Sequence, residues 1–151
     1  MARYPGTATR LEDIGPVREY SLNPSRALLL GFPLALFLGA LLSDIAYYRS
    51  YEIQWANFAA WLIAGALVFA AVVLLIALID FFRQREGRAR PTILMVLVGA
   101  MWILGFINAL IHARDGWASM PTGLVLSVIV ALLALAAAWV GLTGTRRVEA
   151  N

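Results

Sequence analysis

Four long apolar runs alternate with short polar segments along this chain of 151 residues. The runs cover residues 27–48, 55–81, 92–113 and 121–143. A helix rises about 1.5 Å per residue, so roughly 20 apolar residues cross a hydrocarbon core about 30 Å thick. None of the runs shows the polar–apolar alternation that a membrane-spanning strand requires. The pattern predicts an all-α membrane protein, an antiparallel bundle of four transmembrane helices with short connections.

The polar segments divide the chain into three predicted parts: a polar tail at 1–25, the four-helix transmembrane domain at 26–145 and a second tail at 146–151. The first tail has no apolar stretch before a small-residue cleavage site, so we expect the first span to act as an uncleaved signal. Hydrophobic residues make up 62% of the chain and charged residues 14%, whereas soluble domains are roughly half apolar and a quarter charged. The chain has no cysteine, which excludes thiolate metal sites and cysteine nucleophiles within it.

The distribution of arginine predicts an orientation. Ten of the twelve arginines lie in the two tails, at position 26 directly after the first tail, and in the connection FRQREGRAR, and the other two connections hold only Arg49 and Arg114. Those two connections carry aromatic residues typical of a membrane interface: Tyr47, Tyr48, Tyr51, Trp55 and Trp117. Cytoplasmic segments are enriched in positive charge, so we expect a bacterial inner-membrane protein with both termini in the cytoplasm.

The positive charge is therefore interpreted as a signal of topology, and no nucleic-acid partner is expected. Five arginines flank the spans on the predicted cytoplasmic side, where lipid phosphates would attract them. These basic residues, expected to face lipid, are Arg26, Arg83, Arg85, Arg88 and Arg90.

Small residues within the spans predict how the helices pack. Membrane helices associate through close backbone approach and a few polar contacts, because lipid is as apolar as leucine. The first span offers a seam at four-residue spacing, formed by Gly31, Ala35, Gly39 and Ser43. This seam could pack within the bundle or drive dimerisation, and the sequence leaves both open.

Polar residues near the outer ends of three spans predict a cluster. Asp44 shares its depth with Asn57 and with Asn108 and His112, which lie one helical turn apart. Such groups are costly to leave unpaired in lipid, so we expect them to form hydrogen bonds, with Arg114 and Trp61 nearby. The cluster could be a polar staple between helices. The alternative is a small outward-facing site for a proton, a quinone headgroup or a partner subunit.

No complete catalytic or cofactor motif accompanies this cluster. Asp80 lies three residues before Arg83 and is expected to pair with it or with another arginine of that connection. His112 is the only histidine, and a haem b between helices generally takes two axial side chains. One histidine and two separated carboxylates do not form a nucleophile–base set. We therefore expect no enzyme activity and no bound cofactor or metal.

The chain resembles the membrane-protein family known as domain of unknown function 2231 from residue 23 to about residue 143. The segments that carry the resemblance are NPSRALLLGFPLALFLGALLSDIAYY, LIALIDFF, FINALIHARDGW and MPTGLVLSVIVALLALAAAWVGLTG. The family's first-helix motif matches Phe32, Pro33, Gly39, Leu42 and Asp44. Its second-helix aspartate matches Asp80, and an asparagine and an arginine match Asn108 and Arg114.

The chain departs from the family at the start of the first helix. Typical members carry a His-Pro-x-His-Pro sequence, and this chain has Asn23, Pro24, Ser25, Arg26 and Ala27 instead. Some relatives are fused to Rieske-type iron–sulfur domains, which implies a membrane redox setting. A metal or haem role based on those histidines does not carry over to this chain.

Two functional hypotheses follow. The first is a non-catalytic membrane protein that acts as a small accessory or scaffold subunit of a larger, possibly redox, bacterial membrane assembly. Its expected partners are the lipid bilayer and either other membrane subunits or further copies of the chain. The alternative is a redox, quinone-associated or haem-associated carrier that uses the cluster of Asp44, Asn108 and His112.

Overall fold

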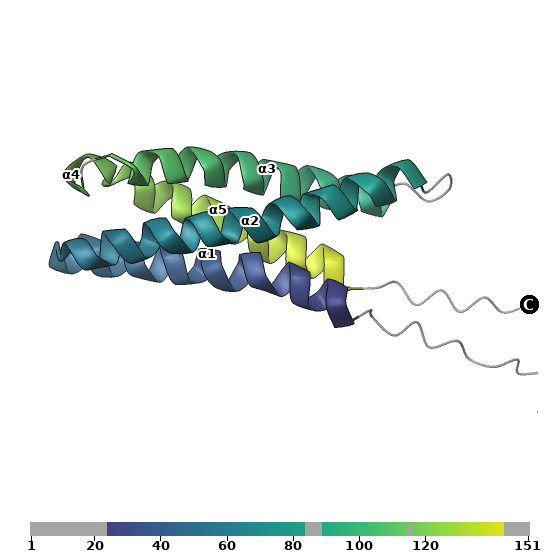
Figure 1. Cartoon of the computed structure of the whole chain (residues 1–151), viewed down its shortest axis with the longest axis horizontal. Coiled ribbons are helices and arrows are strands. Elements are labelled where there is room, and N and C mark those ends of the chain that lie inside the picture. Colours follow the sequence, from purple (N-terminus) through teal and green to yellow (C-terminus); the bar gives the residue numbers. More distant parts are fainter. Residues whose placement is uncertain (1–23, 84–88, 115, 144–151) are drawn as a thin grey trace, which may run out of the picture.

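The computed structural model describes residues 24–83, 89–114 and 116–143, which form helices and short connections (Figure 1). The helices are α1 (Pro24–Ser50), α2 (Ile53–Arg83), α3 (Ala89–His112), α4 (Gly116–Ser119) and α5 (Thr122–Leu142). All except α4 are long and apolar enough to cross a membrane, which confirms the predicted fold class. The single turn α4 was not predicted. Both predicted tails, apart from Pro24 and Ser25, lie outside the described residues.

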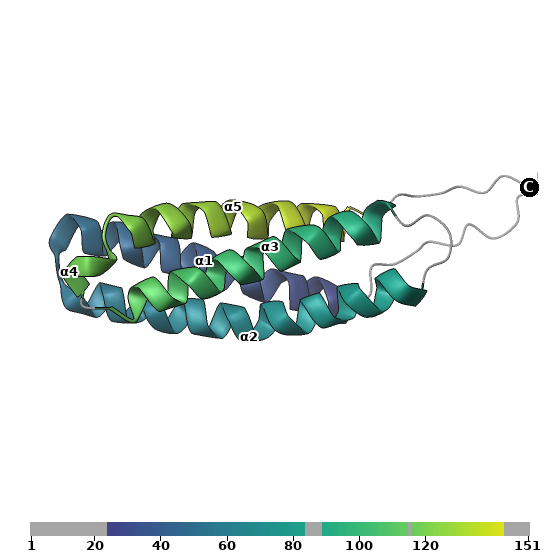
Figure 2. The ribbon, with the colours of Figure 1, turned by 90° about the horizontal axis from the view of Figure 1, so that it is seen from above.

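The four long helices form an antiparallel bundle (Figures 1 and 2). α1 packs against α2 and α5, and α3 packs against the same two helices. α1 and α3 are therefore diagonally opposite across the bundle. We call the end at which α1 begins and α5 ends the Arg26 end, and the opposite end, which carries α4, the Tyr51 end.

Many of the buried side chains are alanines, and many of the large apolar side chains point outward. The buried face of α2 consists mostly of alanine at helical spacing: Ala56, Ala59, Ile63, Ala66, Ala70, Val73 and Ala77. Trp61, which is 78% exposed, lies on the outer surface together with Leu42 and Trp139. Small residues allow close helix approach, and exposed bulky residues suit contact with lipid. The transmembrane helices therefore contact the bilayer through their outer faces.

Only half of the predicted small-residue seam of α1 packs against another helix. A Cβ atom added at Gly39 would lie 3.3 Å from Leu62 Cδ1 of α2, and the buried Ser43 donates a hydrogen bond to the carbonyl oxygen of Gly39. Gly31, in contrast, has open space at its Cβ position, and Ala35 is exposed. The half of the seam nearer the Arg26 end thus faces outward.

The connection between α1 and α2 is a tight turn at the Tyr51 end. Tyr51 adopts a left-handed conformation with φ of 56°, and its amide donates to the carbonyl oxygen of Tyr47 at 2.8 Å. The exposed Tyr48, Tyr51 and Trp55 suit the predicted aromatic belt. Tyr47 does not belong to it, since its side chain is buried in the bundle.

Arginines connect neighbouring helices at the Arg26 end. Arg26 donates to Asp80 through both terminal nitrogens of its guanidinium group, at 2.8 and 3.2 Å. The expected Asp80–Arg83 pair is not formed, and Arg83 is exposed. Arg90 donates to the carbonyl oxygens of Val140 and Gly141 at the end of α5. A guanidinium there satisfies carbonyls that have no partner within their own helix. Arg85 and Arg88 lie outside the described residues.

Candidate functional site

Asp44 lies inside the bundle because of its position in the helical repeat of α1. Phe37, Ala40, Asp44 and Tyr47 follow at spacings of three and four residues and are all buried. The repeat that places the apolar residues in the core therefore carries the carboxyl group with them. Asp44 is completely buried, so its oxygens must find partners within the protein.

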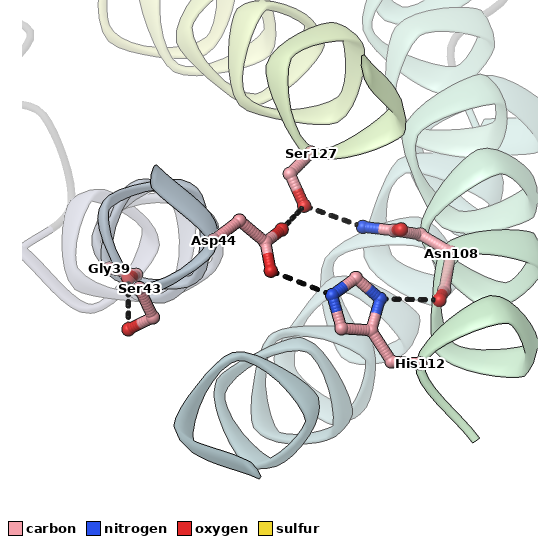
Figure 3. A network of polar contacts seen from close by, with 6 residues as sticks. All are labelled: Gly39, Ser43, Asp44, Asn108, His112 and Ser127. Carbon is pink, nitrogen blue, oxygen red and sulfur yellow. Dashed lines mark hydrogen bonds and ion pairs between the residues drawn. The ribbon is translucent and has the colours of Figure 1, made fainter. Parts of the chain in front are cut away.

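His112, the last residue of α3, is the main partner of Asp44 (Figure 3). Its Nε2 atom lies 2.8 Å from Asp44 Oδ1, and the two side chains are 1% and 0% exposed. The other ring nitrogen, Nδ1, lies 2.9 Å from the backbone carbonyl oxygen of Asn108. Both ring nitrogens are thus in hydrogen bonds, and the imidazole is held between its own helix and α1.

Ser127 and Asn108 complete what we call the Asp44 network, which also contains His112. The hydroxyl group of Ser127 in α5 donates to Asp44 Oδ2 at 2.5 Å, and Asn108 Nδ2 donates to Ser127 Oγ at 2.8 Å. The network therefore joins α1, α3 and α5, including the diagonal pair α1 and α3 (Figure 3). The Oδ1 atom of Asn108 is buried without a hydrogen-bond partner.

A glycine in α5 makes room for the imidazole. A Cβ atom added at Gly123 would lie 2.8 Å from His112 Cε1 and 3.4 Å from Nε2. Contacts this short force the neighbouring group to move, and the ring of His112 is fixed by hydrogen bonds at both nitrogens. The absence of a side chain at position 123 is thus a requirement for the Asp44–His112 contact.

The site brings together only some of the residues expected from the sequence. Asp44, Asn108 and His112 meet, whereas Asn57, Trp61 and Arg114 are exposed. All these residues lie at a similar depth along the bundle. Asn57 and Trp61, however, lie on the outward face of α2, between the alanines that face the core.

Ser127 was not predicted to belong to the site. A signal was available, because Ser127 is the only hydroxyl-bearing residue between Thr122 and Thr143 in the last span. It lies about one and a half turns from the start of α5, near the Tyr51 end.

The network can link the helices through hydrogen bonds and can bind protons, but its side chains are not arranged to coordinate a metal ion. An imidazole coordinates a metal through a free lone pair, and both nitrogens of His112 are already in hydrogen bonds. Among residues 24–83, 89–114 and 116–143, no three histidine, aspartate or glutamate side chains are grouped as a metal site would require.

The fold and the network define a multi-pass membrane protein with one buried polar network near the end of a four-helix bundle. The chain belongs to the family described as "Predicted membrane protein (DUF2231)", which matches residues 23–149. The match confirms the resemblance seen in the sequence and covers all the helices from α1 to α5. No curated protein and no solved structure matches the chain.

Proposed function

We propose that this chain is a non-catalytic integral membrane protein that serves as an accessory or scaffold subunit of a larger assembly in a bacterial inner membrane. The observation that carries this proposal is that the polar groups of the Asp44 network are directed at one another and away from the surface. A catalytic site would instead present such groups to a substrate. The network acts as a staple between α1, α3 and α5.

The outer surface supports a role among other membrane components. Exposed leucine, isoleucine, phenylalanine and tryptophan side chains cover all four long helices. Such a surface can be shared between lipid and the helices of another subunit, because both contacts are apolar. The outward half of the α1 seam, around Gly31 and Ala35, adds a place where a helix backbone can approach closely.

A second candidate is a carrier associated with a quinone or a haem. The unpartnered Oδ1 atom of Asn108 favours it, because this atom could accept a hydrogen bond from the hydroxyl group of a quinol. The hydrogen bonds at both nitrogens of His112 oppose the haem version, since an iron ligand needs an open lone pair. The scaffold role is therefore the better supported of the two.

The staple is tested by removing its central carboxylate. We expect Asp44→Leu to lower the free energy of unfolding by about 3–5 kcal/mol, as when one partner of a buried pair is removed. Asp80→Asn should cost much less, because the Arg26–Asp80 pair is partly exposed. Asn57→Ala is the matched control at the same depth, and it should change stability by less than about 0.5 kcal/mol. Reversible unfolding in mixed micelles measures all three.

The subunit role is tested by purification in mild detergent. Membrane proteins that co-purify at a fixed stoichiometry, and are lost when Ala35 is replaced by a bulky residue, would support it. A homogeneous monomer that carries a quinone or an absorbing cofactor would overturn it in favour of the carrier.

A further inference from the structure

We propose that Asp44 and His112 form a binding site for a single proton, and that the bound proton locks α1 to the diagonally opposite α3. The inference rests on the proposed structural role of the Asp44 network and names the ligand that regulates it. It follows from the donors and acceptors that face one another in the network, and from the lack of a further charged side chain beside Asp44 among residues 24–83, 89–114 and 116–143.

The first step concerns Nδ1 of His112. This atom lies 2.9 Å from the carbonyl oxygen of Asn108, and a backbone carbonyl oxygen can only accept a hydrogen bond. Nδ1 must therefore carry a proton. In a neutral imidazole one nitrogen is a donor and the other an acceptor, so a proton on Nδ1 leaves Nε2 with its lone pair.

The second step concerns Nε2 and Asp44. Nε2 lies 2.8 Å from Asp44 Oδ1, and an ionised carboxylate is also only an acceptor. Two lone pairs at this distance repel, so one additional proton must lie between them. It is present either as an imidazolium beside a carboxylate or as a neutral imidazole beside a carboxylic acid. Both descriptions give a pair with no net charge that holds one proton.

The third step is that Ser127 and Asn108 do not supply this proton. The single hydroxyl proton of Ser127 is donated to Asp44 Oδ2, and Asn108 Nδ2 donates to Ser127 Oγ. Asn108 Oδ1 adds another buried acceptor without a donor. The network thus has more acceptors than donor protons, which is the condition under which a buried group of side chains takes up a proton.

The fourth step is that no other described group neutralises Asp44. α4 and α5 carry no titratable side chain. α2 carries only Asp80 and Arg83, and α3 carries only Arg90 besides His112, all three at the Arg26 end. The other titratable residues of α1 near this end are Tyr47, Tyr48 and Arg49, and Arg49 is exposed, as are Glu52 and Arg114 in the connections. A carboxylate buried without a counter-charge is strongly disfavoured. Release of the proton would therefore leave an unbalanced negative charge in the bundle.

The position of the site suits exchange of the proton with one aqueous side. His112 ends α3, and Asp44 lies six residues before the end of α1, or about 9 Å along the helix. Both are close to the Tyr51 end, which α4 covers between α3 and α5 (Figure 2). We therefore assign the proton to the side of the membrane on which α4 lies.

The chain is well suited to a direct test, because it contains a single histidine. Nitrogen-15 labelling of histidine in the full chain, reconstituted in lipid nanodiscs, gives one pair of ring signals, and their shifts report which nitrogens carry protons. Asp44→Asn is the informative variant, since it keeps the shape of the side chain and removes the acid. Asp80→Asn is the matched control at the other end of the bundle.

In the wild type at neutral pH we expect Nδ1 to be protonated. The additional proton should appear on Nε2 or as an infrared carboxylic-acid band that disappears in Asp44→Asn. Asp80→Asn should leave both the ring signals of His112 and this band unchanged.

A neutral ring protonated only on Nε2, beside an ionised Asp44, would overturn the proposal. So would a ring protonated only on Nδ1 in a wild type that shows no carboxylic-acid band from Asp44. Failure of the structural role is distinguishable, because Asp44→Leu would then leave the free energy of unfolding unchanged whatever the protonation state of the ring.

Discussion

Asp80 in α2 forms a bidentate ion pair with Arg26 at the start of α1, 54 residues away in the sequence, and not with Arg83 three residues away. The two side chains are 23% and 57% exposed. The pair fixes the α1–α2 contact at the Arg26 end, opposite the turn at Tyr51.

We expect removal of this pair to weaken the bundle only slightly. Partly exposed ion pairs are screened by solvent, so Arg26→Gln and Asp80→Asn should each lower the free energy of unfolding by up to about 1 kcal/mol. The double variant should cost no more than the larger single change, because both remove the same interaction. Arg83→Gln is the control and should be neutral. Additive losses in unfolding titrations would show that the two residues act independently.

Gly123→Ala should disturb the Asp44 network without removing any of its polar groups. The added Cβ would lie 2.8 Å from His112 Cε1, so the ring must move away from Asp44. We expect a loss of about 1–3 kcal/mol, typical of overpacking, and a change in the ring nitrogen signals of His112.

Gly31→Ala is the matched control for this substitution, since nothing lies within 4 Å of its Cβ position. It adds the same methyl group to a helix and should leave both the stability and the histidine signals unchanged or improve the stability slightly. Equal effects of the two alanines would contradict the role assigned to Gly123.

The isolated chain is predicted to carry no haem b. A haem between membrane helices generally uses two axial side chains, this chain has one histidine and no cysteine, and that histidine uses both nitrogens in hydrogen bonds. A pyridine haemochrome assay should be blank, and His112→Ala should leave the visible spectrum unchanged. One haem per chain that is lost with His112→Ala would revive the carrier function.

The orientation of the bundle remains a prediction from the arginine distribution. Reporter fusions after Ser50 and after Gly116 should report the periplasmic side, and a fusion after Gly87 should report the cytoplasm. The proposed proton would then exchange with the periplasm. A Gly87 fusion that reports the periplasm would reverse both assignments.

The helices could be predicted from the sequence because hydropathy and length are local properties. The predicted spans agree with α1, α2, α3 and α5 to within four residues at each end. The single turn α4 was missed, because its four residues carry no hydrophobic period.

The contacts between helices depend on the direction in which each side chain points. The position of a residue along its helix gives its depth in the membrane but not this direction. Asn57 has the right depth to meet Asp44 but lies on the outer face of α2. Ser127 was not predicted to belong to the cluster, although its hydroxyl group is directed at Asp44. The partner of Asp80 was assigned by nearness along the chain, and only the packing of α1 on α2 brings Arg26 within reach.

The hydrogen bonds of Arg90 to Val140 and Gly141 have a mechanical consequence for the bundle. They tie the start of α3 to the end of α5, and α4 joins the same two helices at the other end. α1 and α2 are closed in the same way, by Arg26–Asp80 and by the Tyr51 turn. Each antiparallel pair is therefore connected at both ends, and these connections oppose piston-like sliding of one helix along the other. Hydrogen bonds that join the two pairs oppose movement of one pair past the other. Near one end these are the bonds of Asp44 to His112 and Ser127. Further along, Trp102 Nε1 donates to the carbonyl oxygen of Leu67.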